Sequence, residues 1–131
     1  MSAPDYPAKH LSPILPVTEM AVTTGFYLEV LGFEAVRKSE HYTILRRGHA
    51  SLHLTQAAPG VLEKARGHFS IYLEVEEIEA LWAHVAQFKD RYKIRDLFDR
   101  DYGMREFHIL DPDGCLVFVG QAIGRTRAQL P

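Results

Sequence analysis

Apolar residues follow a fixed order of spacings along the chain, and that order occurs twice. In the first half, a short apolar stretch predicts a strand over residues 11–17. Apolar positions at three- and four-residue spacings then predict a helix that begins after Thr18, a candidate N-cap, and ends at Gly32. Three alternating stretches follow, and these predict strands over residues 33–38, 42–47 and 50–55.

The second half repeats the order strand, helix, strand, strand, strand. Residues 68–75 alternate cleanly, and residues 77–88 carry apolar side chains on one helical face. Three further strands are predicted over residues 94–98, 105–110 and 115–119. The repeat predicts an α+β fold, one domain over residues 1–131 built from two βαβββ modules. Its parts are the first module 8–56, a connecting segment 57–66, the second module 67–121 and a C-terminal tail 122–131.

Composition excludes several classes of function. The 131 residues carry 15 basic and 17 acidic side chains, a net charge of -2, which gives no general attraction to nucleic acid. No stretch approaches the roughly 20 apolar residues that a membrane span needs, and no secretory signal precedes the first strand, so a cytoplasmic location is expected. The single cysteine, Cys115, begins an apolar strand and is expected to be a small buried hydrophobe.

Polar side chains alternate with apolar ones along three of the predicted strands. Because successive side chains of a strand point to opposite faces, Glu106 and His108 lie opposite Phe107 and Ile109. The same alternation places His53 on the polar face of residues 50–55 and puts His68 and Tyr72 on that of residues 68–75. His, Ser and Tyr suit a half-dry surface, so the pattern predicts a concave ligand site. The alternative is structural: Arg105 and Glu106 form ion pairs with neighbouring strands, and His108 is a wall residue.

Two strings in the chain resemble those of a known family. "PILPVTEMAVTTGFYLEVLGF" and "YGMREFHILDPDGCLVFVGQ" resemble the vicinal-oxygen-chelate superfamily, and the second is most similar to its bleomycin-resistance subgroup. Tyr102 stands where that subgroup has tryptophan. The resemblance implies curled mixed sheets around a cleft, with helices on the outer face. It also implies a homodimer with clefts at or near the interface and with first strands that are exchanged in some members.

The same resemblance bears on metal binding. Metal-dependent members place their ligands at positions that correspond to Ser12, His53, His68 and Phe118 here. A phenyl ring cannot ligate a metal ion, so no catalytic metal and no other cofactor is expected. The alternative is a glyoxalase-like lyase or isomerase, or an extradiol-type dioxygenase. It would hold divalent Fe, Mn, Ni or Zn on His53, His68 and Glu106, with Glu74 as another possible oxygen donor.

The sequence therefore favours a bleomycin-resistance-type protein that binds a small molecule, an antibiotic or a metabolite, over an enzyme. The predicted ligand-binding residues are His53, His68, Tyr72, Tyr102, Glu106, His108 and Phe118. The expected partners are this ligand and a second copy of the chain, with no nucleic acid and no membrane. The near-neutral charge does not single out cationic glycopeptides of the bleomycin class, although the acidic residues Glu74, Asp99, Asp101 and Glu106 predict a locally negative site. An interaction domain with an empty cleft is the third hypothesis.

Overall fold

The computed structural model describes residues 2–65 and 68–124 of the chain, and both modules are present in it. The first contains β1 Ile14–Val17, α1 Met20–Glu29, β2 Glu34–Lys38, β3 Tyr42–Arg47 and β4 Ala50–Gln56. The second contains β5 Ser70–Glu74, α3 Ile78–Val85, β6 Ile94–Asp99, β7 Met104–Leu110 and β8 Leu116–Ala122. A short helix, α2 Val61–Ala65, lies between them, and a 3-10 turn at Ala86–Phe88 extends α3. The predicted α+β order of two βαβββ modules is confirmed.

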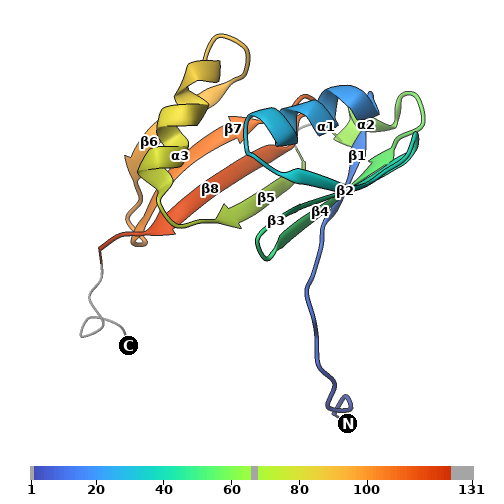
Figure 1. Ribbon diagram of the computed structural model, residues 1–131, viewed down its shortest axis with the longest axis horizontal. Helices are drawn as coiled ribbons and strands as arrows, with labels where there is room; N and C mark the ends of the chain where they lie inside the picture. Colours follow the sequence, from blue (N-terminus) through green and yellow to red (C-terminus); the bar gives the residue numbers. More distant parts are fainter. Residues whose placement is uncertain (1, 66–67, 125–131) are drawn as a thin grey trace.

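Each module forms its own four-stranded mixed sheet, and the two sheets lie side by side (Figure 1). The strand orders are β1-β4-β3-β2 and β5-β8-β7-β6, with the first strand of each module parallel to the last and the other pairs antiparallel. The equivalence of the two orders explains why the hydrophobic pattern repeats. Neither sheet closes on itself, so each keeps one face covered by helix and one face away from it.

One apolar core runs through both modules. Leu45, Leu52 and Leu54 contribute to it from the first sheet, and Phe107 and Val117 contribute from the second. All five side chains are buried, which is worth roughly 1.5–3 kcal/mol for each such residue. Burial of one alternating set per strand fixes the register, because a shift by one residue would expose the whole set. The residues between them must therefore face the other way.

Both long helices begin without a capping side chain of their own. Thr18 was the predicted N-cap of α1, but the N-cap position is Glu19, whose side chain makes no cap hydrogen bond. The backbone N–H of Thr18 and the hydroxyl of Thr23 instead donate to the carboxylate of Asp113. That carboxylate lies in the turn before β8, so the second module holds the start of α1 through the residue before its N-cap and through a side chain in the helix. The prediction of Thr18 as N-cap was wrong: the helix begins one residue later, and Thr18 is instead bound by a carboxylate 95 residues away.

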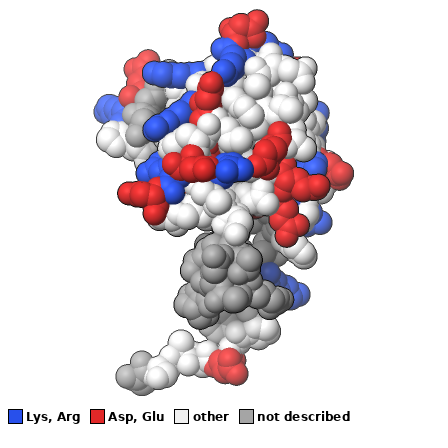
Figure 2. Space-filling model, turned by 90° about the vertical axis from the view of Figure 1, so that its left-hand side faces the viewer, with Lys and Arg blue, Asp and Glu red and all other residues white. Residues whose placement is uncertain are grey.

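Charged side chains of both signs intermingle over the end of the molecule formed by α3 and β6 (Figure 2). Arg105 accounts for part of this mixture, since it forms ion pairs with Asp99 and Glu79. These contacts lie on the helix side of the sheet and lower the pKa of both carboxyl groups through hydrogen bonds from the guanidinium. Arg105 thus has the structural role that was one of the two alternatives. Among the described residues, no helix is long and apolar enough to cross a membrane.

Candidate functional site

The second sheet turns a set of aromatic side chains away from α3. Strand register places Tyr72, Phe118, His108 and Arg95 in one row across the four strands, and Glu74, Gly120, Glu106 and Phe98 in the next. Tyr102 joins them from the turn between β6 and β7. We call the surface formed by Tyr72, Phe98, Tyr102, His108 and Phe118 the aromatic face. Five of the seven predicted ligand-binding residues meet here, four of them on the face and Glu106 beneath it.

Glu106 is the centre of this arrangement. Its Oε2 accepts hydrogen bonds from the hydroxyls of Tyr72 at 2.7 Å and Tyr102 at 2.6 Å, and its Oε1 lies 2.8 Å from Nε2 of His108. The Glu106 side chain is 0% exposed, whereas Tyr72 and Tyr102 are 45% and 54% exposed. A buried carboxylate therefore holds two exposed rings in place from beneath.

The charge of Glu106 follows from its contacts. Burial raises the pKa of the carboxyl, but hydrogen bonds from His108, Tyr102 and Tyr72 outweigh it, and the pKa is lowered from its ordinary value. Burial and the bond to Glu106 raise the pKa of Tyr72, and the bond to Glu106 raises that of Tyr102. Glu106 is thus an anion at neutral pH, and both tyrosines are neutral phenols. They present ring surface to a ligand, and each hydroxyl oxygen keeps an acceptor lone pair.

Gly120 makes this geometry possible. A Cβ at this position would lie 2.0 Å from the Tyr72 hydroxyl oxygen and 3.1 Å from Cγ of Glu106. The Tyr72 side chain therefore lies over β8, in space that a side chain at position 120 would fill. Sequence reasoning missed Gly120, although a glycine inside an alternating strand often marks a close approach of this kind.

Ring contacts connect the remaining members of the face. Tyr72 and Phe118 are stacked at 6.2 Å with an interplanar angle of 14°. The His108 ring lies 4.2 Å from Phe118 and 5.2 Å from Phe98. Phe98 was also missed, because a bulge in β6 changes the alternation between Arg95 and Phe98 and places both on the same face.

The two other predicted residues lie elsewhere. His53 is on the first sheet, where its Nδ1 is 2.7 Å from the Tyr42 hydroxyl. His68 is exposed just before β5. Among the described contacts, none joins either histidine to Glu106 or His108. Their predicted part in ligand binding stays a prediction.

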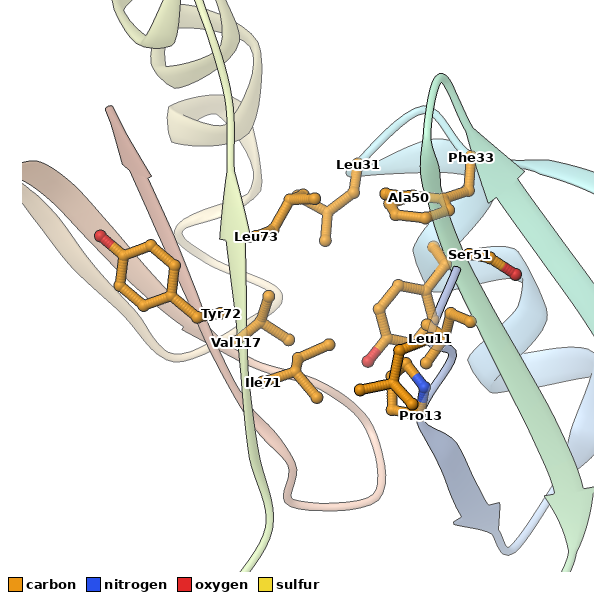
Figure 3. A pocket seen from close by; sticks show the side chains of 12 residues that line it. Leu11, Pro13, Leu31, Phe33, Ala50, Ser51, Ile71, Tyr72, Leu73 and Val117 are labelled. Atoms are coloured by element: carbon orange, nitrogen blue, oxygen red, sulfur yellow. The ribbon is translucent and has the colours of Figure 1, made fainter. Parts of the chain in front are cut away.

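A cavity lined by residues of both modules (Figure 3) shares only Tyr72 with the aromatic face. It has a volume of about 200 Å³, and of the seven predicted residues only Tyr72 lines it. Figure 3 shows Ile71 and Leu73 pointing into this space from β5 while the ring of Tyr72 points to the other side of the strand. Alternation along β5 thus separates an apolar cavity from the polar and aromatic site. In a single chain the aromatic face is an open sheet face.

The proposed metal-ligand set does not come together. Within residues 2–65 and 68–124, no group of three or more His, Cys, Asp or Glu side chains is placed to hold a metal ion. His53 contacts Tyr42, and both oxygens of Glu106 already accept hydrogen bonds or contact His108. The donor set of His53, His68 and Glu106 therefore does not fit a divalent metal in this arrangement.

The family is shown by comparison with known proteins. The model of the glyoxalase/bleomycin resistance protein/dioxygenase superfamily matches residues 8–119. The chain belongs to this superfamily. Bleomycin resistance proteins of Geobacillus stearothermophilus and Staphylococcus aureus are 27% identical to it over 125 residues, with 85% of this chain and 95% of the relatives covered.

Solved structures of similar proteins share the fold. A bleomycin resistance determinant encoded on the transposon Tn5 superimposes with a TM-score of 0.72 and 25% identity, covering 89% of this chain and 100% of that one. A bleomycin-binding protein complexed with bleomycin gives a TM-score of 0.73 and 25% identity, with 87% and 98% covered. The predicted resemblance is therefore confirmed.

Proposed function

We propose that this protein binds a small molecule, an antibiotic or a metabolite, on the aromatic face, as a bleomycin-resistance-type protein without a catalytic metal. The observation that carries the proposal is the pair of half-exposed tyrosines fixed to one buried carboxylate. Aromatic rings give a large contact area, and rings that are already fixed lose little conformational entropy when a ligand binds. The arrangement is suited to capture rather than to chemistry.

A purely structural role would not favour this design. Burying the charge of Glu106 costs free energy, and hydrogen bonds offset that cost only when they are well made. An apolar residue at position 106 would avoid the cost of burying a charge. The carboxylate is therefore better explained by the orientation that it imposes on Tyr72 and Tyr102. The relatives also support a binding function, since they are named bleomycin resistance proteins and one structural neighbour is complexed with bleomycin.

We further propose that a second copy of the chain covers the aromatic face. A site that buries most of a ligand needs a second wall, and one chain supplies only a sheet face. The segment before β1 leads away from the body of the molecule (Figure 1) and exposes Tyr6 and Leu11 at 69% and 94%. Such a segment has apolar surface to bury against a partner. Light scattering should give about twice the chain mass of 14.9 kDa, and a strict monomer would contradict the dimer.

Ligand screening tests the binding proposal. A panel of antibiotics that includes metal-free bleomycin should contain at least one compound that raises the melting temperature, and calorimetry should give its Kd. Phe118→Ala and Tyr72→Ala should each weaken that Kd by about tenfold or more, which corresponds to about 1.4 kcal/mol. His84→Ala removes an exposed ring on the helix side and should leave the Kd unchanged. Failure of bleomycin alone would exclude that drug, whereas no ligand at all would contradict the function.

Elemental analysis separates this proposal from the enzyme alternative. Protein purified without chelator should contain no stoichiometric Fe, Mn, Ni or Zn. About one equivalent that is lost in His68→Ala would instead favour a metal-dependent lyase, isomerase or dioxygenase.

A further inference from the structure

Arg95 extends the aromatic face at its β6 edge. Register places Arg95 directly across from His108, and the bulge in β6 brings Phe98 to the same side of the sheet. The Arg95 guanidinium carbon lies 3.7 Å from the centroid of the Phe98 ring. Stacking occupies one face of the guanidinium and leaves its N–H groups, which lie in the plane, available to an acceptor.

A second arginine, Arg100, contacts the same Phe98 ring. The guanidinium of Arg100 is 5.4 Å from the Phe98 ring and 4.8 Å from the Tyr102 ring. Its NH1 is 3.7 Å from Oε1 of Glu106, too long for a strong hydrogen bond, and its side chain is 30% exposed. Arg100 therefore balances the buried charge of Glu106 and still reaches the surface.

The acidic residues near this edge do not neutralise the positive charge of Arg95. Glu106 is buried beneath the rings, and Asp99 is bound to Arg105 on the other side of the sheet. Asp96 is paired with Lys89. In the part of the chain that the structure describes, Arg95 forms no ion pair, and neither arginine forms one with Asp101. A molecule on the aromatic face thus meets positive charge at the β6 edge, whereas Glu74 places an exposed carboxylate on β5, at the other edge of the sheet.

We propose that the ligand of the aromatic face is a planar aromatic acid whose rings lie on Tyr72, Tyr102 and Phe118 and whose carboxylate is bound by Arg95 and Arg100. This inference rests on the proposed function and specifies its ligand class. The flat guanidinium of Arg95 matches a carboxylate through two parallel hydrogen bonds, a geometry that the ammonium of lysine does not offer. A polycationic glycopeptide would meet repulsion at the same edge.

Three probes of matched size test the charge preference. Titration by calorimetry, with protein NMR to locate the site, compares naphthoate, naphthylmethanol and naphthylmethylammonium. Naphthoate should bind at least about tenfold more tightly than the ammonium, with the alcohol between them. Arg95→Gln and Arg100→Gln should each weaken naphthoate about three- to tenfold and leave the alcohol unchanged, because only the anion uses the guanidinium groups.

Two further variants decide whether the effect is local. Arg95→Lys keeps the charge and should still lose most of the naphthoate preference, since it loses both the stacking and the paired hydrogen bonds. Arg91→Gln removes one positive charge from the ion pair with Glu29 on the helix side and should change nothing. Equal or tighter binding of the ammonium would overturn this inference and leave the proposed function intact. If none of the three probes shifts the resonances of the aromatic face, both the proposed function and this inference fail.

Discussion

The two sheets have the same strand order but very different outward faces. The row of the first sheet that contains His53 is Ile14, His53, Ile44 and Arg37, and among these only His53 makes a described side-chain hydrogen bond, to Tyr42. In the second sheet the corresponding row is Tyr72, Phe118, His108 and Arg95. Ring contacts and hydrogen bonds to Glu106 link its first three members, and Arg95 stacks on Phe98. Duplicated backbone geometry therefore repeats the scaffold without repeating the site.

The difference also shows how the modules depend on each other. The second module provides the aromatic face, and Asp113 in its turn before β8 binds the N–H of Thr18 and the hydroxyl of Thr23 at the start of the first helix. Asp111 in the same turn accepts a hydrogen bond from the hydroxyl of Tyr27, a fully buried side chain of α1. The first module is thus held by the second as well as placed beside it.

Among the substitutions that test how the modules depend on each other, Asp113→Ala should lower the free energy of unfolding most. It leaves the N–H of Thr18 and the buried hydroxyl of Thr23 without their acceptor, so urea unfolding should show a loss of about 2–3 kcal/mol. Asp90→Ala, at an exposed position, is the control and should change stability by less than about 0.5 kcal/mol. If the two variants are equally stable, the modules do not depend on this contact.

Replacement of glycine by alanine should lower the free energy of unfolding at one position in the second module and raise it at another in the first. Gly120→Ala forces the Tyr72 hydroxyl away from Glu106 and should cost about 1–2 kcal/mol. Gly25→Ala, in α1 with open space around its Cβ position, should instead stabilise the chain by about 0.5–1 kcal/mol. Urea unfolding measures both changes. In a Tyr72→Ala background most of the cost at Gly120 should disappear, and a cost that persists would mean that the ring is not what Gly120 accommodates.

Acid pH provides the smallest and most specific test of the second sheet. The folded state lowers the pKa of Glu106 below its ordinary value of 4.5, so the charged carboxylate contributes stability above that pH and loses it as the pH falls through the folded pKa. Glu106→Gln cannot titrate. The difference in unfolding free energy between wild type and variant should therefore shrink as the pH falls below about 4.5.

Unfolding titrations between about pH 7 and pH 3 measure this difference. Burial raises the pKa of Asp111, which gives a pH dependence of opposite sign, but Asp111 is present in both proteins and cancels. A constant difference over the whole range would show that Glu106 is not held as an anion by its hydrogen bonds.

Much of the fold and part of the site could be predicted from sequence. Alternation identified the strand face of Tyr72, Glu106 and His108, and the family resemblance pointed to Phe118. All four lie on one side of the second sheet. His53 does not join them, because it belongs to the other sheet. Arg95 and Phe98 were not predicted to lie on this side, since a bulge in β6 breaks the two-residue period on which the prediction depends.

The sequence by itself determined the elements, their order and the faces of most strands, because helical and strand periods are local properties of the chain. Only the tertiary structure decided which side chains meet. The hydroxyl of Tyr72 reaches a carboxylate 34 residues away, and the bond from the N–H of Thr18 to Asp113 spans 95 residues. Such contacts depend on strand register and on how two modules dock. These are set by burial of the shared core, and no spacing along the chain encodes them.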